Sequence, residues 1–267
     1  MPNINKSGNI EKRRKVWKST IRLGFGGGSF YCSLGFALAE VLITLGIIGI
    51  VAALTIPSLI TNYQKKVTVE RLKQAYTIIY NTIRTVENEN EGPLLTLTAT
   101  NKGDIGKHNF FAELYLVPYL SGLTKTKYKK SPTTWTGNSV YFSPSYIYCM
   151  QNGICFWSFG NGGYNTETEY GWLNYLYVLV DINGPSLPNI SGKDIFYFAV
   201  HFNDTGTIID GKTFGVRATS SMSDLYGDGT DASEGGCNKT GTNWSNGSKC
   251  TEIIMRNNWK IPKEYPW

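Results

Sequence analysis

The chain has 267 residues, of which 41% are hydrophobic and 13% aromatic, enough for a folded core and too apolar for a disordered protein. Its net charge is +6, and residues 1–35 carry all of it, with seven Lys or Arg side chains and one Glu. The chain has 26 Lys or Arg and 20 Asp or Glu residues in total, so the residues after 35 carry 19 positive and 19 negative charges. This balance argues against a nucleic-acid-binding domain, because phosphate contacts need a clustered positive surface.

Residues 41–60 form an uncharged apolar run, VLITLGIIGIVAALTIPSLI. As a helix, twenty residues rise about 30 Å, the thickness of a bilayer hydrocarbon core. The basic residues before the run predict a cytoplasmic N-terminus and an outward C-terminal body, although Lys65 and Lys66 oppose this orientation mildly. A secretory signal peptide is the competitor, but its apolar core has only about 7–15 residues. The run is longer than that and contains Pro57, so we expect one transmembrane span.

Glu40 stands directly before this run, within the stretch GFALAEVLITLGIIGIVAALTIP of residues 35–57. A carboxylate at the edge of an apolar span is costly in lipid and usually has a purpose. The stretch resembles the N-terminal cleavage and methylation segment of type IV prepilins and type II secretion pseudopilins. The resemblance combines a basic leader, a Gly-Phe junction, the glutamate and the uninterrupted span. Ala37 and Ala39 depart from it, because that family usually has Thr or Ser and a larger aliphatic residue there.

The resemblance implies that a prepilin peptidase cuts between Gly35 and Phe36 and that residues 1–35 leave as a cytoplasmic leader. Phe36 would then be N-methylated, and Pro57 would match the family's helix-bending proline. Glu40 would pair with the Phe36 amine of a neighbouring subunit and so set the register of assembly, since an unpaired buried charge costs several kcal/mol. The alternative is that Glu40 reaches the membrane interface and pairs with nothing.

Beyond Pro57, apolar side chains recur at a helical spacing of four and three residues. They are Leu72, Tyr76, Ile79, Ile83 and Val86. Gly92 and Pro93 end the pattern. We therefore expect one helix over residues 36–91, with the span at about 41–60 and an amphipathic second half that packs on its own sheet. A coiled coil is less suited, because the stripe is too short for three or four heptads.

Residues 92–267 are expected to form an outward-facing β-rich domain with a short helix at 109–120. Apolar segments predict strands at 175–182 and 194–202, and a further strand and turn at 207–211. The connecting phrase VDINGPSLPNISGKDIFYF resembles, less specifically, a motif of pseudopilin-like proteins. The expected fold class is α+β and pilin-like, with a long N-terminal helix on a C-terminal antiparallel sheet.

Residues 146–157, YIYCMQNGICFW, predict a β-hairpin, because Asn-Gly between apolar strands is a strong turn signal. A three-residue loop with Gly153 in the left-handed conformation places Cys149 opposite Cys155, within reach of a disulfide. A two-residue loop would place Cys149 opposite Phe156 instead.

The cysteines divide into Cys32, which would leave with the leader, and four in the outward body. An even number in an oxidising compartment predicts disulfides. The pairing of Cys149 with Cys155 and Cys237 with Cys250 is the simplest of three connectivities, and type IV pilins are similar in having a C-terminal disulfide-bounded loop. A zinc site is a poor alternative because the spacings lack a C-x-x-C pair.

Two acidic turns carry candidate calcium ligands: Asp181, Asn183 and Asp194 in the first, or Asp224, Asp228 and Asp231 in the second. Oxygen ligands at alternate positions around a glycine turn suit Ca²⁺, and some pseudopilins bind it near their C-terminal loops. Neither turn has the distal Glu of an EF-hand, and the alternative is that these side chains cap their own backbone. We expect no other cofactor.

The sequence offers no catalytic constellation: His108 and His201 stand in different elements, and no phosphate-binding loop is present.

The resemblance implies a non-enzymatic subunit of a type II secretion pseudopilus or a type IV pilus-like filament. Its expected partners are the prepilin peptidase, other pilin or pseudopilin subunits and the inner-membrane assembly platform. Its expected place is the bacterial inner membrane, with the C-terminal domain periplasmic or in an extracellular filament. The alternative is a membrane-anchored, aromatic-rich module that binds carbohydrate or surfaces and does not polymerise.

Overall fold

The computed structural model of the chain describes residues 38–91, 109–128, 130–140, 144–161, 175–200, 214–216, 222–227 and 236–267. The chain forms two compact units, residues 1–52 and 53–267. The described part of the first unit is helical throughout, whereas the second unit holds the rest of the same helix and all the strands among the described residues.

Helix α1 (Leu38–Glu89) runs for 52 residues, as the apolar run and the amphipathic stripe together predict. It stays helical through Pro57, although proline has no amide hydrogen and removes one backbone hydrogen bond there. Asn90 closes the last turn by donating its backbone N–H to the Val86 carbonyl at 3.1 Å. Glu91 follows with φ 53°, so the chain leaves the helix just before Gly92.

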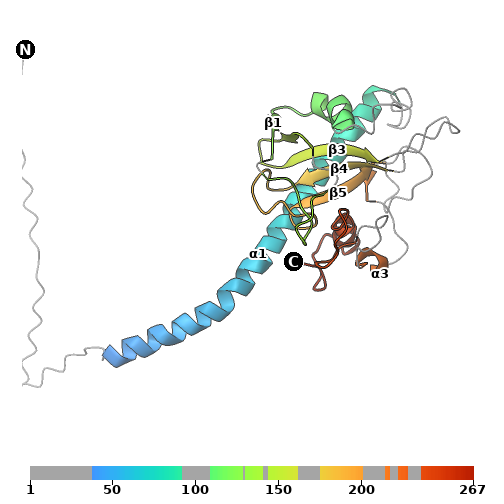
Figure 1. Ribbon diagram of the computed structural model, residues 1–267. Helices are drawn as coiled ribbons and strands as arrows, with labels where there is room; N and C mark the ends of the chain where they lie inside the picture. The colour runs from blue at the N-terminus through green and yellow to red at the C-terminus, as the bar shows by residue number, and fades with distance from the viewer. Residues whose placement is uncertain are drawn as a thin grey trace, which may run out of the picture. The chain divides into compact units, whose positions relative to one another are not determined.

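In the described part of the chain, six strands form one sheet in which every neighbouring pair is antiparallel, and their order in the sheet is their order along the chain (Figure 1). The strands are β1 (Thr124–Thr126), β2 (Ile147–Cys149), β3 (Cys155–Asn161), β4 (Tyr175–Asp181), β5 (Ile195–Val200) and β6 (Phe214–Gly215). The predicted α+β class with an antiparallel sheet is therefore confirmed, and β4 and β5 occupy the two segments expected from their apolar sequences.

One face of the sheet packs on the second half of α1. The stripe residues Leu72, Ile79, Ile83 and Val86 are at most 1% exposed. They belong to one core cluster with the alternate strand residues Val178, Val180, Phe196 and Phe198. Full burial of such a side chain contributes about 1.5–3 kcal/mol, so this stripe holds α1 to the sheet. The expectation that the stripe packs on its own sheet is confirmed.

The other face of the sheet is also covered. Trp157, Leu179 and Tyr197 form a second buried cluster there, with Tyr128 and Trp244 packed against it. Because both faces are covered, all six residues of β5 are buried and the strand shows no polar–apolar alternation.

The helix expected at 109–120 is present in a different form. It consists of a π-helical segment, η2 (Ala112–Leu116), followed by a 3-10 turn, η3 (Val117–Tyr119). Pro118, in the first turn of η3, lacks the amide hydrogen that would continue the π-helical hydrogen bonds, so η2 ends before it. Two further short helices in the described residues, α3 (Met222–Leu225) and α4 (Cys250–Arg256), are not expected from the sequence. The strand expected at 207–211 lies outside the described residues.

Candidate functional site

The first half of α1 presents large apolar side chains to its surroundings. Side chains on all sides of the helix are exposed between Leu38 and Ile60, including Leu42, Ile48 and Leu54. The most apolar 18-residue window has a mean hydropathy of 2.3, and none of it is buried. By length and composition, α1 is the one helix in the described part of the chain that could cross a membrane.

The hydroxyl groups in this segment are few, and they are satisfied by the helix's own backbone. Thr44, Ser58 and Thr61 each direct the side-chain hydroxyl to a backbone carbonyl one turn earlier, at 2.9 Å. Such internal bonds suit a segment in lipid, where water is not available to pair polar groups. Glu40, in the first turn, is then the single charged residue between Leu38 and Lys65. Gly35 and Phe36, where processing is expected, lie outside the described residues.

The first acidic turn brings Asp181, Asn183 and Asp194 together at the ends of β4 and β5. Asp181 accepts from the Tyr128 hydroxyl at 2.7 Å and from the Asn183 backbone N–H at 3.1 Å. Asp194 accepts from the backbone N–H groups of Asn189 and Ile190 at 2.8 and 2.5 Å. Both carboxylates therefore cap backbone turns, as the alternative to a calcium site expects.

Electrostatics in this turn follow from its burial. Burial raises the pKa of Asp181 to about 8, and the nearby Asp194 adds to the rise, while the Tyr128 hydroxyl opposes it. Burial likewise raises the pKa of Asp194 to about 6, against the backbone donors that favour its charged form. Burial and the Asp181 charge raise the pKa of Tyr128 well above its usual value, so its hydroxyl stays a donor.

Oxygen ligands for a cation are present beside these carboxylates. The side-chain carbonyl oxygens of Asn183 and Asn189 are buried and have no hydrogen-bond partner among the described residues. No group of three His, Cys, Asp or Glu side chains gathers as a metal site in the described ranges. In the second acidic turn, Asp224 is exposed in α3, and Asp228 and Asp231 lie outside the described residues. Calcium binding at either turn stays a prediction.

The hairpin has the geometry that the three-residue loop predicts. Cys149 lies opposite Cys155 in the register of β2 and β3, Gly153 has φ 79°, and a disulfide joins the two cysteines with their Cα atoms 3.9 Å apart. We call this the hairpin disulfide. Arg71 of α1 donates to the Asn152 carbonyl in the loop at 2.9 Å, which fixes the hairpin to the helix.

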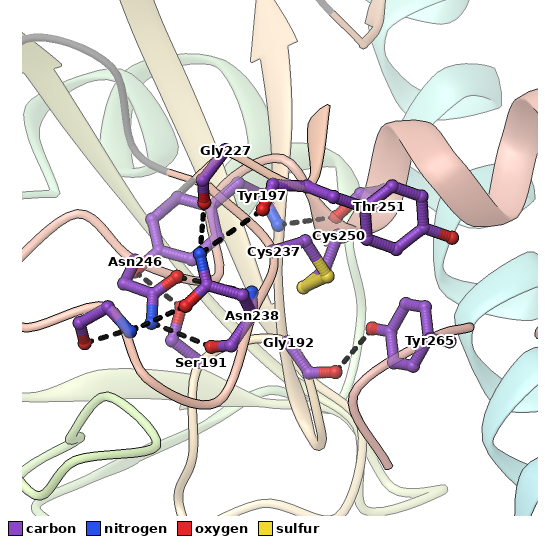
Figure 2. The surroundings of a disulfide bond; sticks show 12 residues. Ser191, Gly192, Tyr197, Gly227, Cys237, Asn238, Asn246, Cys250, Thr251 and Tyr265 are labelled. Atoms are coloured by element: carbon purple, nitrogen blue, oxygen red, sulfur yellow. Dashed lines mark hydrogen bonds between the residues drawn. A yellow bond between two sulfur atoms is a disulfide. The ribbon is translucent and has the colours of Figure 1, made fainter. Parts of the chain in front are cut away.

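The second disulfide joins Cys237 to Cys250, with their Cα atoms 5.0 Å apart, and we call it the C-terminal disulfide. Asn246, fully buried in the enclosed loop, donates its amide to the carbonyls of Asn238 and Gly241 at 2.8 and 3.1 Å (Figure 2). Thr251 accepts from the Tyr197 backbone N–H at 2.9 Å and so ties α4 to the sheet. The loop is thus held by the disulfide and by side-chain amides, with few apolar anchors.

Tyr128 is a partner of the first acidic turn that the sequence does not predict. Tyr128 is 53 residues before Asp181, and no local pattern connects them. Only the fold, which places this segment against the second face of the sheet, brings the hydroxyl to the carboxylate. His108 and His201 lie outside the described residues.

Comparison with known proteins gives one match. The model of a family of unknown function (DUF6613) matches residues 58–267, which is the amphipathic half of α1 together with the whole body. No curated protein and no solved structure matches the chain.

Proposed function

Because the chain belongs to a family of unknown function (DUF6613), we propose its function from its own residues: it is a pilin-like structural subunit of a filament. The filament is of the type II secretion pseudopilus or type IV pilus class. Before assembly, the subunit is a single-pass protein of the inner membrane, with its body on the outer side. It enters the filament after a prepilin peptidase has removed residues 1–35. Its role is structural and not catalytic.

The observation that carries this proposal is the division of α1 into two halves. Residues after Val67 bury one stripe against the sheet, whereas residues 38–60 expose apolar side chains on every side. Exposed apolar surface of this extent needs lipid or other protein around it. A subunit that moves from a bilayer into the core of a helical assembly is surrounded first by lipid and then by other subunits.

Glu40 supports the assembly step. It is the one charge on the apolar half of α1, and its place after the Gly35–Phe36 junction matches the prepilin pattern. In a filament core its carboxylate would pair with the free amine of Phe36 in a neighbouring copy. Removing one member of a buried ion pair costs about 3–5 kcal/mol, because the other charge is left without a partner.

The aromatic binding module has less support. Among the described residues whose side-chain exposure is defined, Tyr63 is the one exposed aromatic side chain, and Trp157, Phe196 and Phe198 lie in the core. Aromatic content therefore reflects packing in the described part of the body, and we do not advance a second function.

Assembly can be tested by substituting Glu40. We expect Glu40→Ala and Glu40→Gln to lower incorporation into filaments by more than about a hundredfold, because the amine of Phe36 loses its partner. Leu42→Ala is the matched control, since it shortens an exposed side chain of the same segment without removing a charge. All three variants should remain membrane-anchored, with both disulfides formed. Filaments that contain Glu40→Ala at the wild-type level would refute the proposal.

A further inference from the structure

A groove of about 510 Å³ lies where α1 leaves the apolar run. Thr61 and Lys65 of α1 form one wall, and the last residues of the chain, with the segment around the C-terminal disulfide, form the other. Among its side chains, the three lysines Lys65, Lys239 and Lys263 outnumber one carboxylate, that of Glu264. The side chains of the groove therefore carry a net positive charge, although the body as a whole is neutral.

Two of these lysines are available to a ligand. Lys65 and Lys263 form no ion pair within the described ranges. Lys65 faces the Trp267 ring, with its Nζ 5.9 Å from the ring centroid. Lys239 donates to a main-chain oxygen of Trp267 and lies 5.6 Å from the Trp135 ring centroid. The Lys65 ammonium lies beside an aromatic ring, and this contact does not neutralise its charge.

The position along α1 indicates which ligand the groove meets. The apolar run ends at Ile60, and Lys65 is five residues further, about 7.5 Å along the helix axis. The headgroup layer on each side of the hydrocarbon core is roughly 5–8 Å deep. Tyr63, 68% exposed between them, and Trp267 in the groove are the residue types that concentrate at a membrane interface. Lys65 therefore lies at the depth of the phosphates when residues 41–60 span the bilayer.

We propose that this groove binds the headgroup of an anionic phospholipid and docks the body on the outer face of the inner membrane. Lys65 and Lys263 contact the phosphate, Lys239 positions Trp267, and the tryptophan ring lies against the upper acyl chain. The inference rests on the membrane-anchored state in the proposed function. The proposal also explains a lysine on the outer side of the span. Lys65 runs against the rule that positive residues stay on the cytoplasmic side, and an anionic headgroup would compensate its charge.

The test uses the full chain in nanodiscs that contain phosphatidylcholine and phosphatidylglycerol in equal amounts. The lipids retained by the protein after mild detergent extraction are counted by native mass spectrometry. We expect wild type to retain phosphatidylglycerol preferentially and Lys65→Gln to lower that preference about fivefold, the effect of one lysine near an anionic surface. The triple variant Lys65→Glu, Lys239→Glu, Lys263→Glu should abolish it.

The matched control changes the same total charge elsewhere, at the exposed lysines Lys73, Lys127 and Lys130, each to Glu. It should retain phosphatidylglycerol as wild type does. Equal loss in both triple variants, or no preference in wild type, would overturn the lipid site and leave the filament proposal untouched. Failure of the chain to enter nanodiscs at all would overturn both.

Folding is monitored by near-ultraviolet circular dichroism and by the mass change on reduction, which shows that both disulfides had formed. If the triple variant misfolds, Lys65→Gln still tests the site, because it adds no negative charge. A groove variant that keeps its lipid preference but fails to enter filaments would show that a second subunit occupies the groove, and would overturn the proposal.

Discussion

Truncation of one isoleucine on each half of α1 tests the division of the helix directly. Ile79 is 0% exposed in the core beneath the sheet, whereas Ile48 is 63% exposed in the apolar run. Ile79→Ala removes buried methyl and methylene groups and leaves a cavity, which costs about 2–5 kcal/mol of the free energy of unfolding. Ile48→Ala removes the same groups from the same helix, but Ile48 does not pack in the core. Its effect on the free energy of unfolding should therefore be under about 0.5 kcal/mol.

The assay is urea unfolding of the full chain in detergent micelles, with the disulfides intact and tryptophan fluorescence as the probe. Buried Trp157 reports on the body, and the slope of the transition shows whether both variants unfold the same surface. A cost for Ile79→Ala below about 1 kcal/mol would refute the packing of α1 on the sheet. An equal cost for Ile48→Ala would show that the apolar half is part of the folded core.

Three further predictions concern the body. Burial raises the pKa of Asp181 to about 8, so the folded state holds a proton that the unfolded state releases near pH 4, and stability should fall as pH rises from about 4 to about 8. Asp181→Asn should flatten this fall in urea titrations at pH 5 and pH 8, and an unchanged slope would contradict the assignment. Loss of the C-terminal disulfide, with a sequence separation of 13, should lower the free energy of unfolding by roughly 3 kcal/mol in the same titrations. Loss of the hairpin disulfide, with a separation of 6, should lower it by about 0.6 kcal/mol less. The reverse order would show that loop closure does not dominate the effect of the disulfides. A calcium ion in the first acidic turn predicts that EDTA lowers Tm by several degrees in calorimetry, and an unchanged Tm would leave turn capping as the role of those residues.

The elements that the sequence predicts correctly are those with a strong local signal. Helix α1 has an uninterrupted apolar run and a regular stripe, and the hairpin at Cys149 and Cys155 has an Asn-Gly turn, so each follows from neighbouring residues. Strands β4 and β5 follow from their apolar content, because strands covered on both faces need no alternation.

Elements defined by distant contacts could not be predicted in this way. Strand β1 is three residues long and mostly exposed, and it exists because it pairs with β2. Helix α4 is stabilised by burial of Ile253 and Ile254 in the core beside the helix stripe. The lysines of the groove are up to 198 positions apart, from Lys65 to Lys263, so only the fold brings them together. The apolar pair in CTEIIMR was the one available signal for α4.

The mass of the N-terminus decides whether the chain is processed as a pilin-like subunit. The protein is isolated from cells that contain the prepilin peptidase, and its intact mass and N-terminal peptide are measured. We expect a chain that begins at N-methylated Phe36. A chain that still begins at Met1, or that is cut at another residue, would contradict it and leave a single-span anchored domain.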